Sequence, residues 1–356
     1  MDQTGKEKIQ LRHSKDDKKQ YRKRKKGKKN RAEQETSRPC KVPKSTTLEV
    51  QNSSKLSRKI TSRAHTIVRM AVSRNPRSTF LTPNLRSALL PTRKGRNSTN
   101  HQPRSMVPEL NRSMLSCPGD KDIVLGEGTY GMTRLMKYNG SLSVAVKEYK
   151  GNDLYEVKKE AGVISELQRQ HHPNLPFILG VCLKEKPYLM ITQFYGRGKK
   201  SYSLSRAISR EIIKFHELSN VFKQIVDALQ NVHETGWLHN DIKENNVLMH
   251  NTSLEWKPVV IDFGKSRPQT NPKKYKLTDN QKAVYKVKHP WIAPELIEGT
   301  HAQSQESDVY SLGVLFQNML GKFIQRNYSI ENLAGKCTAP QPTLRISLKQ
   351  LKDELK

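Results

Sequence analysis

The pattern of apolar and polar residues changes near positions 117–120. Before that point the sequence is basic and of low complexity, with apolar residues too scattered to mark a strand or a helix. After it, short apolar runs at 123–125 and 133–137 flank a cluster of glycines. Short apolar runs bounded by turn residues predict β-strands. We therefore expect a folded domain to begin at about Asp120 and to open with a β-hairpin.

Later stretches have equally clear periods. Residues 142–146 form another apolar strand pattern, and residues 153–169 carry apolar side chains at helical spacing. A long amphipathic helix is expected to end near His233, and residues 259–261 form a short buried strand. The domain should therefore contain both strands and helices.

The first 115 residues have the composition of a disordered tail. They carry 30 Lys or Arg against 8 Asp or Glu, a net charge of +22, and the other 241 residues supply only +9. They are nearly free of aromatic residues, so they bury too little apolar surface to offset the entropy of ordering the backbone. We predict a disordered basic tail over residues 1–115 and a folded domain over residues 120–356.

The densest basic run extends from Tyr21 to Arg31 and reads YRKRKKGKKNR. Such a run is typical of segments that bind a nuclear import receptor or a polyanion such as nucleic acid, and equally of a solvated charge cluster. No aromatic residues are interleaved for base stacking. Binding of nucleic acid through this run is therefore expected to be electrostatic and salt-sensitive.

Cysteine usage and hydropathy suggest the compartment. The four cysteines are widely spaced and form no Cys-x-x-Cys pair, which favours a reducing environment. The N-terminus has no apolar core for a signal peptide, and no run of eighteen apolar residues exists to span a bilayer. We expect an intracellular protein, in the nucleus or the cytoplasm, with no membrane partner.

The glycine cluster at residues 126–131 reads GEGTYG. Glycines let the backbone approach phosphate oxygens closely, so that its amides can donate to them. A Rossmann dinucleotide site needs a helix directly after such a loop, whereas residues 133–140 predict a strand and a turn. The order favours a phosphate-binding loop inside a hairpin.

Three short motifs follow one another further along the chain. Residues 239–248 read HNDIKENNVL after the long helix, residues 262–264 read DFG after the short strand, and residues 293–295 read APE. Together with the glycine loop, they resemble the catalytic, metal-binding and activation-segment motifs of the eukaryotic protein kinase superfamily. The resemblance implies a protein kinase that uses ATP and Mg²⁺ and has protein substrates.

The resemblance also implies a role for each matching residue. Asp241 matches the catalytic aspartate, which orients the substrate hydroxyl and accepts its proton, and Lys243 steadies the transferring phosphate. Asn246 and Asp262 match the magnesium ligands. Their oxygens suit that ion, which keeps several waters and completes its shell with nucleotide phosphates.

Lys147 follows the strand at 142–146, close behind the glycine loop. A carboxylate on the next helix can hold its ammonium by a charge-assisted hydrogen bond and aim it at the phosphates. Both Glu160 and Glu156 lie on that helix. The match of residues 160–175 to the family favours Glu160.

The segment at residues 188–196 resembles the strand and hinge against which adenine lies in the family. Thr192 matches the gatekeeper position, and the backbone from Gln193 to Tyr195 is expected to bond the base edge. The residues expected to contact ATP are Leu125, Gly126, Glu127, Gly128, Thr129, Tyr130, Gly131, Thr133, Ala145, Lys147, Thr192, Gln193 and Tyr195.

The implied fold is α+β and bilobal. A small N-lobe of antiparallel strands with one helix is expected over about 120–195, and a mainly α-helical C-lobe over about 196–356. The part after Gly313 is shorter than is usual in the family. Asp308 resembles the buried aspartate that braces the catalytic loop, and Arg345 is placed to pair with Glu295.

The sequence departs from the family pattern at positions that bear on regulation of the kinase and on its choice of substrate. Asn240 stands where most kinases have arginine, so it offers no charge to hold a phosphorylated activation loop. The activation segment is rich in lysine, which fits either a solvated loop or one that attracts acidic or already phosphorylated substrates.

The type of hydroxyl remains open at this point. Lys243 resembles the serine/threonine pattern, and we favour that class. The threonine usual before APE is absent, however, and residues 172–196 resemble the tyrosine-kinase-like groups, so a tyrosine kinase is the alternative. A pseudokinase scaffold, or a kinase attached to a nucleic-acid tether formed by the tail, is a further alternative, although the residues that catalysis requires are present.

Overall fold

The computed structural model describes residues 107–128, 131–151, 153–252 and 255–355. Residues 107–118 and 123–355 group into one unit, and residues 119–122 belong to another. The predicted disordered tail and the basic run from Tyr21 to Arg31 lie outside the described residues, except for residues 107–115.

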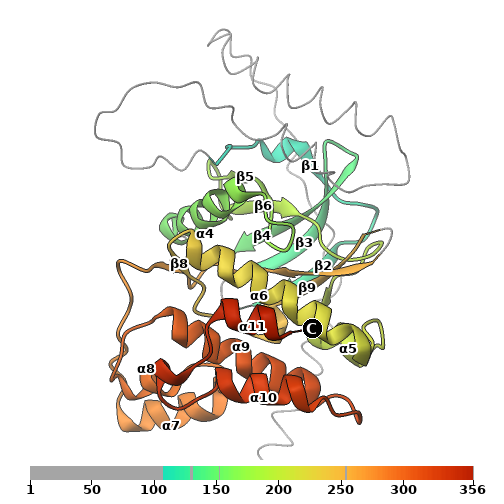
Figure 1. Cartoon of the computed structure of the whole chain (residues 1–356). Coiled ribbons are helices and arrows are strands. Elements are labelled where there is room, and N and C mark those ends of the chain that lie inside the picture. Colours follow the sequence, from blue (N-terminus) through green and yellow to red (C-terminus); the bar gives the residue numbers. More distant parts are fainter. Residues whose placement is uncertain (1–106, 129–130, 152, 253–254, 356) are drawn as a thin grey trace, which may run out of the picture. The chain divides into compact units, whose positions relative to one another are not determined.

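The N-lobe is built on a six-stranded antiparallel sheet (Figure 1). Its strands are β1 (Leu115–Ser116), β2 (Ile123–Glu127), β3 (Gly131–Tyr138), β4 (Leu142–Tyr149), β5 (Ile178–Cys182) and β6 (Leu189–Gln193). Their order is β1-β3-β4-β6-β5, and β2 pairs with the other part of β3. Strands β3 and β4 pair without interruption around a turn in which Asn139 and Gly140 have positive φ. The expected strands are therefore confirmed.

Helix α4 (Leu154–Leu167) is the α-helix of this lobe. It begins after Asp153, whose side chain accepts a hydrogen bond from the backbone N–H of Tyr155 at 2.9 Å. The apolar side chains predicted from its period are buried and belong to the same core cluster as Val181 and Met190 of β5 and β6. The lobe of antiparallel strands with one helix is confirmed.

Residues 107–116 are folded onto this lobe, which corrects the predicted boundary at residue 115. Leu110 N–H donates to Val181 O at 2.7 Å, and Val181 N–H donates to Pro108 O at 2.9 Å, so the segment lies along β5. A Cβ on Gly180 would stand 2.5 Å from Pro108 O. The close approach needs glycine at this position. Residues 107–116 are too few to show a periodic pattern, so the sequence did not predict this packing.

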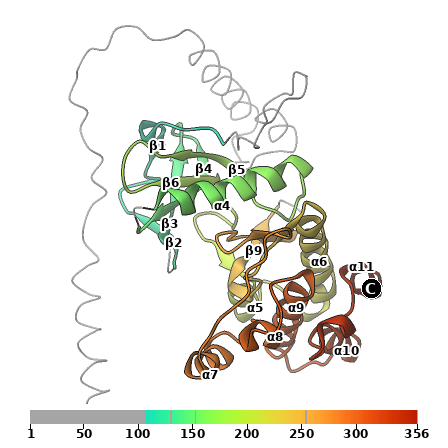
Figure 2. The same cartoon turned by 90° about the vertical axis from the view of Figure 1, so that its left-hand side faces the viewer.

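The C-lobe is mainly helical, as predicted (Figure 2). Its helices are α5 (Leu204–Ser209), α6 (Leu218–Glu234), α7 (Asp279–Lys288), α8 (Pro294–Glu298), α9 (Gln305–Leu320), α10 (Tyr328–Cys337) and α11 (Leu348–Glu354). Phe222 of α6 stacks on Phe316 of α9, with ring centroids 4.0 Å apart. These two helices form the centre of the C-lobe core.

Short strands place the functional loops. Strands β7 (Tyr202–Ser203), β9 (Val247–Asn251) and β10 (Trp256–Val260) form one small sheet, and β8 (Trp237–Leu238) pairs with β11 (Arg267–Pro268). The 3-10 helices are η1 (Arg112–Met114), η2 (Gln168–Gln170), η3 (Phe215–Glu217), η4 (Glu244–Asn246) and η5 (Pro342–Leu344). The motif at residues 239–248 starts directly after β8 and ends within β9. The DFG motif at residues 262–264 follows β10. Among the described helices, none is long and apolar enough to span a membrane.

Candidate active site

Lys147 and Glu160 form an ion pair between strand β4 and helix α4. The ammonium of Lys147 lies 2.9 Å from Oε1 and 2.7 Å from Oε2 of Glu160, whose carboxylate is buried. Glu156, the competing candidate, lies one turn earlier and contacts Lys159 at 3.7 Å. The structure thus brings Lys147 together with Glu160.

Tyr149 completes this pair from the same face of β4. Its hydroxyl donates to Glu160 Oε2 at 2.7 Å, and burial raises the pKa of Tyr149 well above its ordinary value, so the phenol stays neutral. Burial alone lowers the pKa of Lys147, but the carboxylates of Glu160 and Asp262 outweigh it and raise the pKa. Lys147 therefore remains a cation that points from the N-lobe toward Asp262.

Asp262 lies beyond the end of β10 with φ at +67°, a left-handed conformation that aspartate tolerates better than most residues. Its Oδ1 lies 3.4 Å from Lys147 Nζ, and its side chain is 34% exposed. Lys159 of α4 donates to Gly264 O at 2.9 Å, which fixes the same segment from a second point. The exposed part of the Asp262 carboxylate is therefore available to a metal ion.

The loop before Asp241 is braced from helix α9. Asp308 accepts from the backbone N–H groups of His239 and Asn240, both at 2.8 Å, and its Oδ2 lies 3.0 Å from His233 Nε2. Asp308 is buried. This confirms the bracing role expected for Asp308, and it holds Asn240 at a φ of +64°.

His239 is buried beneath the same loop, and burial lowers its pKa, which favours the neutral ring. Its Nδ1 accepts from Asp241 N–H at 3.2 Å, and its Nε2 lies 3.2 Å from Ile261 O. Both contacts are satisfied by the tautomer that carries its proton on Nε2. The ring thereby links the Asp241 loop to the strand before Asp262.

The Asp241 carboxylate accepts from four side chains. Its Oδ2 accepts from Lys243 Nζ at 2.8 Å and from Asn246 Nδ2 at 3.1 Å. Its Oδ1 accepts from Lys265 Nζ at 3.0 Å and from Trp291 Nε1 at 3.1 Å. Burial alone raises the pKa of Asp241, but the two lysines outweigh it and lower the pKa to about 2. The group is an ionised base at neutral pH.

Asn246 is oriented by Asp241 and by the strand that leads to Asp262. Its Nδ2 also donates to Asp241 O at 2.8 Å, and its backbone carbonyl accepts from Ile261 N–H at 2.8 Å. With the amide nitrogen engaged, Oδ1 is the atom left to face a metal. An amide oxygen and a carboxylate suit magnesium, so the residues present fit that ion. No cluster of three or more His, Cys, Asp or Glu that could hold a metal occurs among the described residues.

The glycine loop is described on either side of Thr129 and Tyr130, two expected ATP contacts that lie outside the described residues. Leu125, Gly126 and Glu127 are in β2, and Thr133 is in β3, beside Lys147 in the pairing with β4. A Cβ on Gly126 or Gly128 would meet nothing within 4 Å. The side-chain positions of these two glycines therefore face open space.

Gly131 has a different function. A Cβ there would stand 2.1 Å from Glu148 O of β4, so the close pairing of β3 and β4 requires glycine. Gly128 N–H donates to Gly131 O at 2.9 Å and closes the turn. The third glycine of the motif thus shapes the loop rather than exposing its backbone.

The expected adenine contacts lie on β4, β6 and the segment that follows. Ala145 pairs with Thr192 across these strands, and both are half-buried. The N–H of Gln193 donates to Phe177 O at 2.9 Å, and the hydroxyl of Tyr195 accepts from Phe177 N–H at 2.8 Å. The N–H of Gln193 is therefore engaged with the N-lobe, and the buried Tyr195 side chain anchors the segment to the same lobe.

Glu295 and Arg345 form the expected ion pair. Two guanidinium nitrogens of Arg345 each lie 2.7 Å from a carboxylate oxygen of Glu295, and the pair is buried. Arg345 also donates to Glu306 O at 2.9 Å. The end of the activation segment is thereby fixed to the last part of the chain.

Sequence reasoning missed three residues that contact this site. Tyr149 could have been found, because it lies two residues after Lys147 on a strand and hence on the same face. Lys265 and Trp291 reach Asp241 from distant parts of the activation segment, and no period or motif signals such contacts.

The comparisons with known proteins agree with this geometry. The family described as "Protein kinase domain" matches residues 120–334. The chain is 34% identical over 198 residues to the tyrosine-protein kinase transforming protein Abl of Abelson murine leukemia virus, covering 54% of this chain and 24% of that protein. It is 30% identical to the tyrosine-protein kinase Btk of Drosophila melanogaster, covering 54% of this chain and 23% of that protein.

Relatives of the other class are similarly close. A probable serine/threonine-protein kinase of Dictyostelium discoideum is 29% identical over 198 residues, covering 54% of this chain and 20% of that protein. The chain thus spans less than a quarter of the length of these three relatives. The matched region includes the site residues described above, except Arg345. By fold, by site and by sequence, the chain belongs to the protein kinase domain family.

Proposed function

We propose that this domain transfers the γ-phosphoryl group of MgATP to serine or threonine hydroxyls of proteins. The observation that supports the proposal is the convergence of a charged Lys147, an ionised Asp241 and the oxygen ligands of Asn246 and Asp262. Phosphoryl transfer depends mainly on positioning and electrostatic stabilisation, and these groups supply both.

Each residue has a definite task in this reaction. Lys147, held by Glu160, binds phosphate oxygens of the nucleotide. Asp241 orients the acceptor hydroxyl and takes its proton as the oxygen bonds to the γ-phosphorus and the bond to the β-phosphate oxygen breaks. Asn246 and Asp262 would hold magnesium, which when bound would neutralise charge on the phosphates.

Lys243 supports the serine/threonine assignment, because a lysine two residues after the catalytic aspartate resembles the serine/threonine pattern rather than the tyrosine one. Its ammonium lies 2.8 Å from Asp241 Oδ2, beside the carboxylate at which the acceptor hydroxyl must arrive. There it can neutralise the transferring phosphoryl group. Tyrosine is the alternative acceptor, favoured by the names of the Abl and Btk relatives.

Phosphoryl transfer from labelled ATP tests the proposal. The full chain, Mg²⁺ and mixed peptides containing Ser, Thr and Tyr are incubated, and the phosphorylated amino acid is identified. Asp241→Asn is the control, because it keeps the shape of the side chain but removes the base. Label on Ser or Thr that disappears in this variant supports the proposal, and label on Tyr alone replaces it with the alternative. No label from a folded chain favours a pseudokinase scaffold.

We also propose that the run from Tyr21 to Arg31 binds a nuclear import receptor or a polyanion and so directs the protein to the nucleus. Its density of positive charge supports this. Fluorescent fusions of the full chain and of a chain lacking residues 1–106 test it. Nuclear accumulation of the full chain alone, with phosphoryl transfer retained by both, is the expected result. Equal distribution of the two fusions contradicts it.

A further inference from the structure

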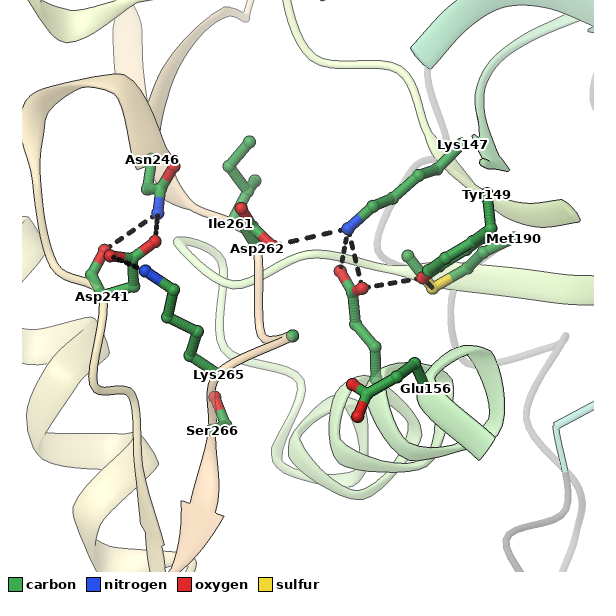
Figure 3. A network of polar contacts seen from close by, with 12 residues as sticks. Lys147, Tyr149, Glu156, Met190, Asp241, Asn246, Ile261, Asp262, Lys265 and Ser266 are labelled. Carbon is green, nitrogen blue, oxygen red and sulfur yellow. Dashed lines mark hydrogen bonds and ion pairs between the residues drawn. The ribbon is translucent and has the colours of Figure 1, made fainter. Parts of the chain in front are cut away.

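Lys265 occupies the position beside Asp241 that an acceptor hydroxyl needs. Its ammonium lies 3.0 Å from Oδ1 (Figure 3). The same oxygen accepts from Trp291 Nε1 at 3.1 Å. The other oxygen, Oδ2, accepts from Lys243 and Asn246. A hydroxyl that is to give its proton to this carboxylate must therefore displace one of four donors.

Three of these donors are fixed by other contacts. Asn246 also donates to Asp241 O, and the ammonium of Lys243 lies 4.9 Å from the centroid of the Trp291 ring. Trp291 packs edge-on against His289, and its backbone carbonyl accepts from Ser311 Oγ at 2.7 Å. These side chains cannot leave without disturbing the loop or the end of the activation segment.

Lys265 is the donor that can move. Its side chain is 38% exposed, on a flexible four-carbon stem. Its backbone is fixed independently, since Asn240 Nδ2 lies 3.3 Å from Lys265 O and the next residues pair in β11 with β8. The ammonium can therefore swing off Asp241 without unfolding the segment.

The surroundings favour an anion as the new partner of that ammonium. Lys243 also faces the acceptor position, and burial followed by the charges of Lys265 and Lys243 lowers the pKa of His289. Lys243 and Lys265 share the single carboxylate of Asp241, which leaves one positive charge in excess beside the acceptor position. Lys282 and Lys286 of α7 are paired instead with Glu298, at 3.3 Å and 2.7 Å. The excess beside Asp241 is therefore the one that an incoming acceptor group meets.

We propose that Lys265 is a specificity-determining residue, whose ammonium exchanges Asp241 for an acidic or phosphorylated group close to the acceptor hydroxyl. This inference rests on the proposed phosphoryl transfer. A neutral substrate must break the Lys265–Asp241 pair and offers the ammonium no charged group in exchange. An anionic substrate replaces the lost ion pair as it exposes the base, so it reaches the reactive arrangement at a lower free energy.

The test compares matched peptides on the full chain. Each has one acceptor hydroxyl, of the kind that the chain phosphorylates, and carries Asp, phosphoserine or Asn within two residues of it. The kcat/KM of each is measured for the natural chain, for Lys265→Met and for Lys265→Arg. Lys286→Met is the matched control, because it removes one positive charge from the same segment at a position paired with Glu298.

The expected result is that Lys265→Met lowers kcat/KM for the anionic peptides but not for the neutral one. Lys265→Met should lower kcat/KM for the anionic peptides about two- to fivefold, the equivalent of one exposed charge pair. For the Asn peptide, kcat/KM should stay unchanged or rise, because the ammonium of Lys265 no longer covers Asp241. Lys265→Arg should keep most of the preference, and Lys286→Met should keep all of it.

Any of three results would overturn the inference. One is an equal loss on all three peptides in Lys265→Met, which would make the residue merely structural. Another is a natural chain that does not distinguish the peptides, and the third is a preference that Lys286→Met reduces as much as Lys265→Met does.

Binding separates failure of this inference from failure of the proposed function. The Kd of labelled Asp and Asn peptides is measured by fluorescence anisotropy for the natural chain and Lys265→Met. If no phosphoryl transfer occurs, a preference for the Asp peptide that Lys265→Met abolishes still supports the role of Lys265. The same Kd values in both chains would contradict it.

Discussion

Replacing Arg345 by Met should destabilise the domain severely, because it leaves the Glu295 carboxylate buried without a partner. The guanidinium makes two 2.7 Å contacts with that carboxylate, and its side chain is fully buried. The same substitution removes donors to Ala339 O and Glu306 O. Methionine fills much of the arginine stem's volume, so the charge, rather than a cavity, dominates the change.

Breaking a buried ion pair by removing one partner costs about 3–5 kcal/mol of the free energy of unfolding. For a domain of this size each kcal/mol lowers the midpoint of thermal unfolding by about 2–4 °C. Together these values place the midpoint of Arg345→Met about 6–20 °C below that of the natural chain. Differential scanning calorimetry of the full chain measures the shift.

An exposed ion pair of the same region provides the control. Lys336 lies 2.8 Å from Glu354, with both side chains more than 40% exposed, so Lys336→Met should change stability by no more than about 1 kcal/mol. The double variant Glu295→Leu with Arg345→Met removes both charges and should recover part of the loss. An Arg345→Met midpoint no lower than that of Lys336→Met would refute this reasoning.

Three further predictions concern the site and the core. Lys147→Met should reduce phosphoryl transfer on the order of 100- to 1,000-fold, because it removes one preorganised cation, as steady-state kinetics would show; a loss under tenfold contradicts this role. Gly131→Ala should lower the free energy of unfolding by about 1–3 kcal/mol in urea titrations, since its Cβ meets Glu148 O at 2.1 Å, while Gly126→Ala should change it little. Burial raises the pKa of the Cys337 thiol to about 12, so its alkylation at pH 8, followed by mass spectrometry, should require unfolding; rapid labelling of the native chain would be the opposite result.

Periodicity and motif order were sufficient for the fold and for the residues that the family shares. The strands of the N-lobe and helix α4 follow from apolar periods, because those periods reflect which face is buried. The contacts of Glu160 with Lys147 and of Arg345 with Glu295 followed from the resemblance. The shortened end of the C-lobe and the roles of the ATP contacts stay predictions.

The remaining contacts depend on side chains that meet only after folding. Trp291 and Lys265 both reach Asp241, yet they lie 50 and 24 residues away in the chain. Neither belongs to a periodic face, so the sequence shows no sign of the contact. The folding of residues 107–115 was missed for a related reason. It depends on Gly180, which lets Pro108 and the residues after it approach β5.

The site is held together largely by residues that do not take part in the chemistry. Asp308 fixes the backbone on one side of Asp241, and Arg345 fixes Glu295 near the end of the activation segment that carries Trp291. Two residues of the site, Asn240 and Asp262, have positive φ, a conformation that needs support from its surroundings. Because Asp308 of α9 supports Asn240, and Arg345 holds Glu295 a few residues after Trp291, the geometry of Asp241 depends on the C-terminal segments. Truncating them should therefore impair catalysis even though every residue assigned to phosphoryl transfer precedes them.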